Sequence, residues 1–103
     1  MFRRYYSHYI YIYPNIYLKN TIVEFDAENK ISDIFLFEKE IEKTEFYSGW
    51  LYLVDTQENI LHLELNLDSS PSFADVESAL KLVRGRSFII IDEDKRIITN
   101  TCV

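Results

Sequence analysis

Residues 23–37, VEFDAENKISDIFLF, carry the pattern that decides the fold. An apolar run ends at Asp26, a short polar connection follows, and a second apolar run begins at Ile31. Asp and Asn favour such connections because their side chains bond nearby backbone amides and tolerate left-handed backbone geometry. The stretch therefore predicts two antiparallel strands joined by a short turn.

The same arrangement occurs twice more along the chain. One copy runs from 51–55 into 60–65 and the other from 88–92 into 97–99, each with an Asp at the end of its first run. Within the first of these copies, Leu alternates with polar residues over 61–67, the pattern of a strand with one buried face. Three antiparallel pairs are expected.

A further strand is expected near the N-terminus, where residues 9–13 alternate Tyr with Ile. Both faces of that strand would be large and partly apolar, so we expect both to be covered. One helix is predicted near residues 72–84. Ser72 followed by Asp75 resembles a capping box, an apolar stripe follows at helical spacing, and Gly85 stands where a left-handed cap is expected.

These elements predict a mainly β (α+β) fold. About seven strands in antiparallel hairpins would form a small sandwich or barrel-like sheet with one added helix. With 103 residues, of which 48% are hydrophobic and 27% charged, the chain has the composition of one folded domain. We expect a single domain over 1–103, with a β region at 1–67 and the helix plus a final hairpin at 68–103.

Charge and cysteine content narrow the function classes. The formal net charge of −6 repels phosphate, so no nucleic-acid partner is expected. Cys102 is the single cysteine, which favours a reducing compartment over a disulfide-stabilised one. The N-terminal residues lack the apolar core of a signal peptide, and no run approaches the roughly 18 apolar residues that span a bilayer. A cytoplasmic location without a membrane partner is expected.

The residues offer little recognisable catalytic chemistry. His62 and Glu64, two positions apart on one strand face, are the candidates for an acid/base pair or half of a metal site. The alternative is an exposed polar strand face, which alternation alone produces. The chain has two histidines and two glycines, too few for a zinc motif or a glycine-rich phosphate loop. No catalytic residue, metal or cofactor is therefore predicted.

Tyrosines are concentrated at the start of the chain, with six of the eight among the first 17 residues. Tyrosine joins an apolar ring to a polar hydroxyl, a combination favoured at interfaces and ligand platforms. Strand propensity and a place in the core are the alternatives. The candidate binding or interface residues are Tyr5, Tyr9, Tyr11, Tyr13 and Tyr17.

Four stretches occur in this order along the chain: SHYIY at 7–11, YLKNTIVEFD at 17–26, KISDI at 30–34 and TEFYSG at 44–49. In this order they resemble the N-terminal segment of metal-dependent amidohydrolases, the cytosine-deaminase and chlorohydrolase-like group. In that family the segment is a small composite β domain that precedes the catalytic barrel. The resemblance thus implies a composite-domain fold for the β region.

The chain departs from the family where the first barrel strand would end in a His-x-His metal pair. Within 60–65, His62 matches the second histidine but Ile60 stands at the first. A barrel needs about 250 residues and does not fit in this chain. The expected function is therefore a non-catalytic, β-rich interaction or structural domain. A degenerate or partner-dependent amidohydrolase, and a small-ligand module that uses the Tyr cluster, are the alternatives.

Without a barrel, the face that the composite domain buries against it needs another cover, since a large exposed apolar patch favours association. Residues 66–103 and a second copy of the chain are both available for this. We therefore expect a homodimer with Tyr-rich contacts, or a complex with another protein.

Overall fold

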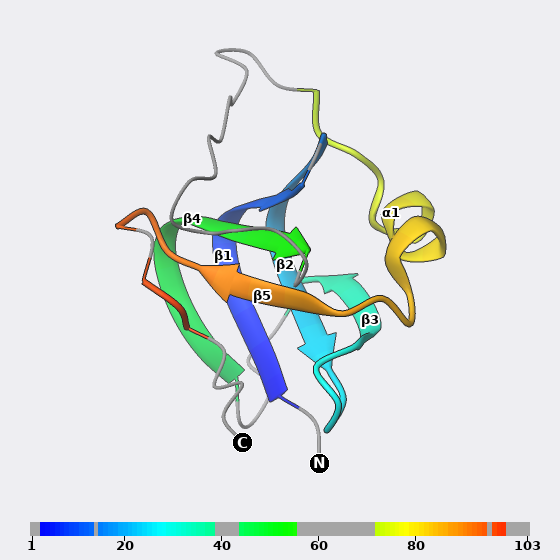
Figure 1. The fold of residues 1–103 in the computed structure, drawn as a ribbon. Helices are drawn as coiled ribbons and strands as arrows, with labels where there is room; N and C mark the ends of the chain where they lie inside the picture. The colour runs from blue at the N-terminus through cyan, green and yellow to red at the C-terminus, as the bar shows by residue number, and fades with distance from the viewer. Residues whose placement is uncertain (1–2, 14, 39–43, 56–71, 95, 99–103) are drawn as a thin grey trace.

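The computed structural model describes residues 3–13, 15–38, 44–55, 72–94 and 96–98. These residues are mainly β, with five strands and one short helix (Figure 1). In chain order the elements are β1 (Arg3–Ile12), β2 (Ile16–Phe25), β3 (Ile31–Leu36), β4 (Thr44–Asp55), α1 (Val76–Val83) and β5 (Phe88–Ile91).

All five strands belong to one mixed sheet in the order β3-β2-β1-β4-β5. The β1–β2, β2–β3 and β4–β5 pairs are antiparallel, whereas β1 and β4 are parallel. The expectation of antiparallel hairpins throughout is therefore wrong for the central pair. A parallel partner must return through a long crossover, so no local turn signal marks it in the sequence.

Two of the three predicted hairpins can be compared with the structure. The β2–β3 hairpin is confirmed, and in its turn Asp26 Oδ1 accepts from the backbone N–H of Glu28 at 2.8 Å and of Lys30 at 3.1 Å. After β5 the chain turns back at Asp92, and among the described residues one isolated bridge, Ile91 to Ile97, joins the two sides of the turn. The second strand of the middle hairpin, 60–65, lies outside the described residues.

The sheet is strongly curled into a half-barrel, in which β5 begins near the start of β3 and runs toward β4 (Figure 1). The two sheet edges meet where Lys30 and Ser87 form an antiparallel bridge. Beside it, Ile31 N–H donates to the Arg86 carbonyl at 2.9 Å and Gly85 N–H donates to the Ile31 carbonyl at 2.8 Å. We call this junction the closing seam.

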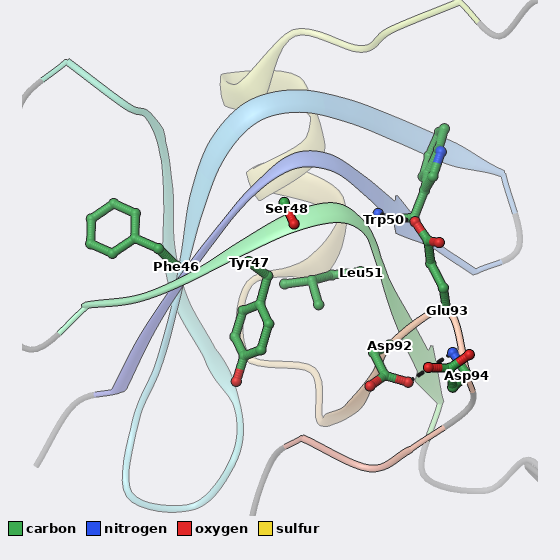
Figure 2. Close-up of a pocket in the computed structure, with 8 residues that line it drawn as sticks. All are labelled: Phe46, Tyr47, Ser48, Trp50, Leu51, Asp92, Glu93 and Asp94. Carbon is green, nitrogen blue, oxygen red and sulfur yellow. Dashed lines mark hydrogen bonds between the residues drawn. The ribbon is translucent and has the colours of Figure 1, made fainter.

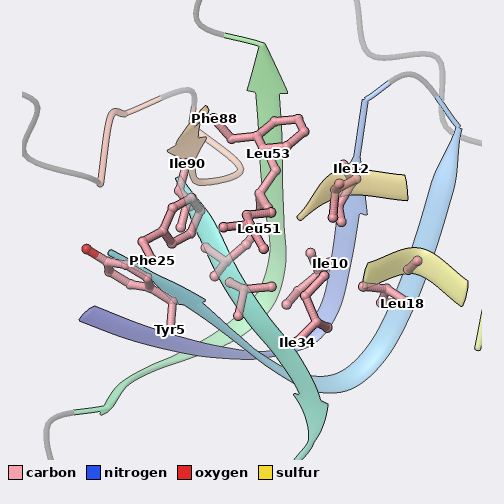
Figure 3. Packing of buried hydrophobic residues seen from close by; sticks show 14 residues of the cluster. Tyr5, Ile10, Ile12, Leu18, Phe25, Ile34, Leu51, Leu53, Phe88 and Ile90 are labelled. Carbon is pink, nitrogen blue, oxygen red and sulfur yellow. The ribbon is translucent and has the colours of Figure 1, made fainter. Parts of the chain in front are cut away.

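The main hydrophobic core fills the inside of the half-barrel (Figure 3). Its largest fully buried members come from all parts of the sheet: Ile10, Ile12, Leu18, Phe25, Ile31, Leu51, Leu53, Phe88 and Ile90. Helix α1 packs on β3 and β2, and its Ala79 and Val83 join the same core. The described residues thus form a curled single sheet with a helix against it.

Helix α1 starts later than the sequence predicts. Asp75, not Ser72, is the N-cap, and its Oδ2 accepts from Ser78 N–H at 3.1 Å. The residues before it are held in a non-helical path because Ala74 N–H donates to the Tyr17 carbonyl at 2.7 Å. The end is as expected, since Gly85 adopts a φ of +82° just after the helix.

The regular alternation of buried and exposed side chains breaks at the same level of the sheet in β1 and β2. Two consecutive exposed residues occur in β1, His8 and Tyr9, and two in β2, Lys19 and Asn20. Asn20 has a φ of +52°. Since alternation normally sends neighbours to opposite faces, this break lets both members of each pair lie outside the barrel.

Strand β4 carries a bulge at the same level. Ser7 pairs with Tyr47 but Tyr9 pairs with Trp50, so two residues of β4 face one of β1. Gly49 lies in this bulge with a φ of +90°, and its carbonyl accepts a hydrogen bond from the Ser7 hydroxyl. The bulge restores the register above the break and places Trp50 beside Tyr9.

Candidate functional site

The structure divides the five candidate tyrosines between the two faces of the sheet. Tyr5 belongs to the inner core, is 3% exposed and packs edge-on against Phe25 at 6.0 Å between ring centroids. Tyr11 and Tyr17 are buried in a separate cluster with Tyr52. That cluster lies on the outer face, because Tyr11 stands between Ile10 and Ile12, which both point into the core.

Tyr13 packs against the outer cluster and is half-buried, whereas Tyr9 is 40% exposed. The expectation that the Tyr-Ile strand is covered on both faces is confirmed for Tyr11 and Ile12, at 2% and 0% exposure. Of the five candidates, Tyr9 is the one that presents a large ring surface to solvent.

Tyr9 is part of a stack of rings on the outer face. Its ring lies 5.0 Å from Trp50 with a 23° interplanar angle, and 6.0 Å from Phe73 with a 30° angle. Trp50 in turn lies 6.3 Å from Tyr52 at 2°. We call Phe73, Tyr9, Trp50 and Tyr52 the ring stack. Lys19 Nζ lies 5.1 Å from the Phe73 centroid.

This geometry bears on ligand binding. Neighbouring rings in the stack already face one another, so a sugar or base that stacked on Tyr9 would have to displace Phe73 or Trp50. The contact between Phe73 and Tyr9 instead anchors the chain before α1 to the sheet. Such an arrangement suits packing against a protein surface better than intercalation of a planar ligand.

A second group of rings lies below the break in the strands. Tyr6, Phe37 and Phe46 contact one another, with centroid distances of 4.8, 5.4 and 5.9 Å. Phe46 is 47% exposed while Tyr6 is 8% exposed. We call these three residues the Tyr6 cluster. Because Tyr6 and Phe46 are paired in register across β1 and β4, the parallel pairing is what brings them together.

Polar side chains separate the two groups of rings. The Tyr6 hydroxyl donates to Asn20 Oδ1 at 2.6 Å and lies 3.3 Å from His8 Nδ1. Since the phenol hydrogen is used on Asn20, we assign a hydrogen to His8 Nδ1, which then donates to the Tyr6 hydroxyl. We call the ring stack, the Tyr6 cluster, His8 and Asn20 together the outer aromatic face.

A cleft of about 350 Å³ borders this face between β4 and the turn after β5 (Figure 2). Phe46 lies at one end of it, and Trp50 lies with Glu93 at the other (Figure 2). The remaining lining residues are Tyr47, Ser48, Leu51, Asp92 and Asp94. We call Asp92, Glu93 and Asp94 the acidic rim.

Two carboxylates of the rim fix the local backbone. Glu93 Oε1 accepts from Trp50 N–H at 2.8 Å, and Asp92 Oδ1 accepts from the N–H groups of Asp94 and Arg96, both at 2.9 Å. The side-chain ion pairs found among the described residues, Arg4–Glu24 and Lys30–Glu28, do not involve the rim, so its carboxylates have no cationic partner within this part of the chain.

The acidic surroundings also act on the nearby phenols. Burial raises the pKa of Tyr47, and the negative charges of Glu45 and Asp92 raise it further. Burial likewise raises the pKa of Tyr52, with a smaller contribution from Glu93. Both hydroxyls therefore stay protonated at neutral pH and can donate hydrogen bonds.

The other candidates for chemistry fall on residues that the structure does not describe. His62 and Glu64, the metal or acid/base candidates, lie outside the described residues, as does Cys102. Among the residues that the structure describes, no three His, Cys, Asp or Glu side chains are grouped so that they could hold a metal ion. No helix in this part of the chain has the length and apolar character needed to cross a bilayer.

Several residues of the outer face were not among the sequence candidates: Tyr6, Phe37, Phe46, Trp50, Tyr52 and Phe73. A cross-strand pairing of aromatic residues would have revealed most of them, but that pairing depends on the parallel register.

No family model, no curated protein and no solved structure matches this chain. The fold and the face define a small β-rich domain with a five-stranded, mixed and curled sheet, and no family is assigned to it.

Proposed function

We propose that this protein is a non-catalytic interaction domain whose outer aromatic face contacts another protein or a second copy of the chain. The observation that carries the proposal is the exposure of Phe46 and Tyr9, at 47% and 40%, both on the outer aromatic face. Aromatic side chains are enriched at the centres of protein interfaces, and clustered exposed apolar groups are typical of contact sites.

The likeness to the amidohydrolase accessory domain belongs to the same proposal. Two of the four similar stretches, 7–11 and 44–49, supply His8, Tyr9 and Phe46 to the outer face. We propose that the chain has the β region of such a domain and uses the outer aromatic face for contacts of its own. This part of the proposal rests on the sequence stretches alone.

A matched pair of surface variants tests the proposal. Phe46→Ser removes an exposed ring from the outer face, and Leu82→Ser removes an exposed apolar side chain, 65% exposed, from α1. Peptides would be selected from a random library on the wild-type protein and then measured on both variants. In parallel, sedimentation over a range of concentrations would report self-association.

We expect Phe46→Ser to weaken the affinity of the selected peptides, or of self-association, at least about tenfold, because rings at interface hot spots contribute on this scale. Leu82→Ser should leave the same affinity unchanged. A monomer at every concentration, together with selected peptides that bind both variants as well as wild type, would contradict the proposal.

A further inference from the structure

We infer that the partner of the outer aromatic face is a basic protein segment. Its apolar groups would cover Phe46 and Tyr9 while its Arg or Lys side chains lie along the acidic rim. The inference rests on the proposed function and specifies the kind of partner.

The face and the rim are close enough for one segment to contact both. Phe46 and Trp50 belong to the outer aromatic face and also line the cleft whose other wall is the rim (Figure 2). Glu93 is bonded directly to the backbone N–H of Trp50 at 2.8 Å. A chain lying on these rings is therefore within reach of the rim carboxylates.

The charges around the face are unequal. Three carboxylates border the cleft and have no cationic partner among the described residues, while Glu45 on β4 adds a further exposed acid near Tyr47. The described cations nearby are Lys19, in register with Tyr9 at the opposite edge, and Arg96, which follows the rim in the same turn. With a formal net charge of −6 the whole chain attracts cationic partners and raises their association rate.

Rings beside carboxylates form a favourable environment for guanidinium and ammonium groups, which bind to ring faces and to carboxylates together. Two cation–ring contacts occur among the described residues: Lys19 Nζ lies 5.1 Å from the Phe73 centroid and Arg86 Cζ lies 5.0 Å from the Phe88 centroid. The exposed ring of Phe46 offers an equivalent surface at the cleft.

A second copy of the chain fits the charges less well. It would bring another acidic rim and another net charge of −6 to the contact, so like charges would oppose association. Self-association is therefore an alternative outcome of the experiment.

Trp50 lines the cleft and is the single tryptophan of the chain, so its fluorescence reports binding at the cleft. The probes are two hexapeptides, one that alternates Arg with Leu and one that alternates Glu with Leu. We expect the basic peptide to change Trp50 fluorescence in a saturable way, with an affinity that falls as salt is added. The acidic peptide is expected to have no effect.

Two double variants with the same net charge separate the rim from the overall field. Glu93→Gln with Asp94→Asn removes two rim charges, and the amide oxygen introduced by Glu93→Gln can still accept from Trp50 N–H. Glu28→Gln with Glu77→Gln removes two charges from exposed positions elsewhere. We expect the rim variant to bind the basic peptide roughly tenfold more weakly, and the control variant to bind within about twofold of wild type.

The outcomes distinguish the two proposals. Equal weakening by both double variants, or no binding of the basic peptide, would overturn the inference about the partner. If self-association or peptides from the library still depend on Phe46, the proposed function stands and a second copy or an uncharged partner replaces the basic segment. If nothing depends on Phe46, both proposals fail.

Discussion

Gly49 occupies a backbone position that disfavours a side chain for two reasons. Its φ of +90° is unfavourable for other residues, and a Cβ at this position would lie 2.5 Å from Glu93 Oε1. Gly85 shares only the first reason, since its φ is +82° and a Cβ there would meet nothing within 4 Å. The two glycines therefore separate backbone strain from steric contact.

We predict that Gly85→Ala lowers the free energy of unfolding by about 1–2 kcal/mol, the cost of a left-handed backbone for an L-residue. Gly49→Ala is expected to cost more, because Glu93 must also move and its bond to Trp50 N–H is disturbed. Urea denaturation measures both. The excess should shrink when Gly49→Ala is combined with Glu93→Ala, and equal costs for the two single variants would contradict the account.

Two buried phenols predict a stability change at alkaline pH. Burial raises the pKa of Tyr5 and of Tyr52 above the ordinary value near 10. Below about pH 10 both groups are protonated in the folded and unfolded chains, so no stability is lost. As the pH rises further, the unfolded chain releases its protons first, and the free energy of unfolding falls.

The measurement is urea denaturation at about pH 8 and about pH 11 for wild type and for Tyr5→Phe. We expect the variant to lose less stability between the two pH values, because one group of raised pKa is gone. Tyr9→Phe, at a 40% exposed position, controls for the loss of a hydroxyl. An unchanged alkaline loss in Tyr5→Phe would contradict the assignment.

At the scale of single elements, features with local signals were predicted from the sequence. The β2–β3 hairpin follows from Asp26, whose carboxylate does bond the backbone of the turn, and the end of α1 follows from Gly85. The start of α1 was predicted wrongly. Ser72 has the right chemistry for a cap, but Ala74 N–H is used by the Tyr17 carbonyl, a contact that only the folded chain provides.

The corrected cap gives a prediction. Asp75→Ala should lower the free energy of unfolding by about 1 kcal/mol, since the Asp75 carboxylate satisfies the N–H of Ser78. Ser72→Ala should change it by no more than a few tenths of a kcal/mol, since Ser72 is exposed and precedes the helix. Thermal and urea denaturation compare the two. A larger loss of unfolding free energy for Ser72→Ala than for Asp75→Ala would show that Ser72, as the sequence suggested, is the cap.

The parallel pairing of β1 and β4 explains why the candidate site was predicted only in part. Tyr9 was identified from the concentration of tyrosines, but its stacking partner Trp50 lies far along the chain and meets it through the bulge at Gly49. Tyr5 belongs to the core because the alternation of β1 breaks at His8 and Tyr9. Neither the register nor the break has a local signature.

At the scale of the whole molecule, the closing seam joins the two edges of the curled sheet. There the start of β3 is bonded to the residues just before β5. Ile31 and Gly85 are the donors there, bonded to the Arg86 and Ile31 carbonyls at 2.9 and 2.8 Å. Both the hairpin turn of β2–β3 and the end of α1 meet at this point. The seam therefore links elements that are far apart in sequence.

Amide hydrogen exchange tests how firmly the seam is closed. We expect the N–H groups of Ile31 and Gly85 to exchange as slowly as those in the middle of β1, because opening them requires separation of the sheet edges. The N–H of Glu28, which is bonded to Asp26 in an exposed turn, should exchange quickly. Exchange of Ile31 and Gly85 at the rate of Glu28 would show that the half-barrel opens at this edge.

The central place of β1 has a consequence for biosynthesis. The ribosome releases Arg3–Ile12 before the other four strands of this sheet, yet one of its edges is paired only after Thr44–Asp55 has been made. Strand β2 protects the opposite edge early, through a local connection. Until β4 has been synthesised, one edge of β1 is unpaired and both of its faces, one aromatic and one aliphatic, are without part of their cover. We therefore expect this protein to need a chaperone most during translation.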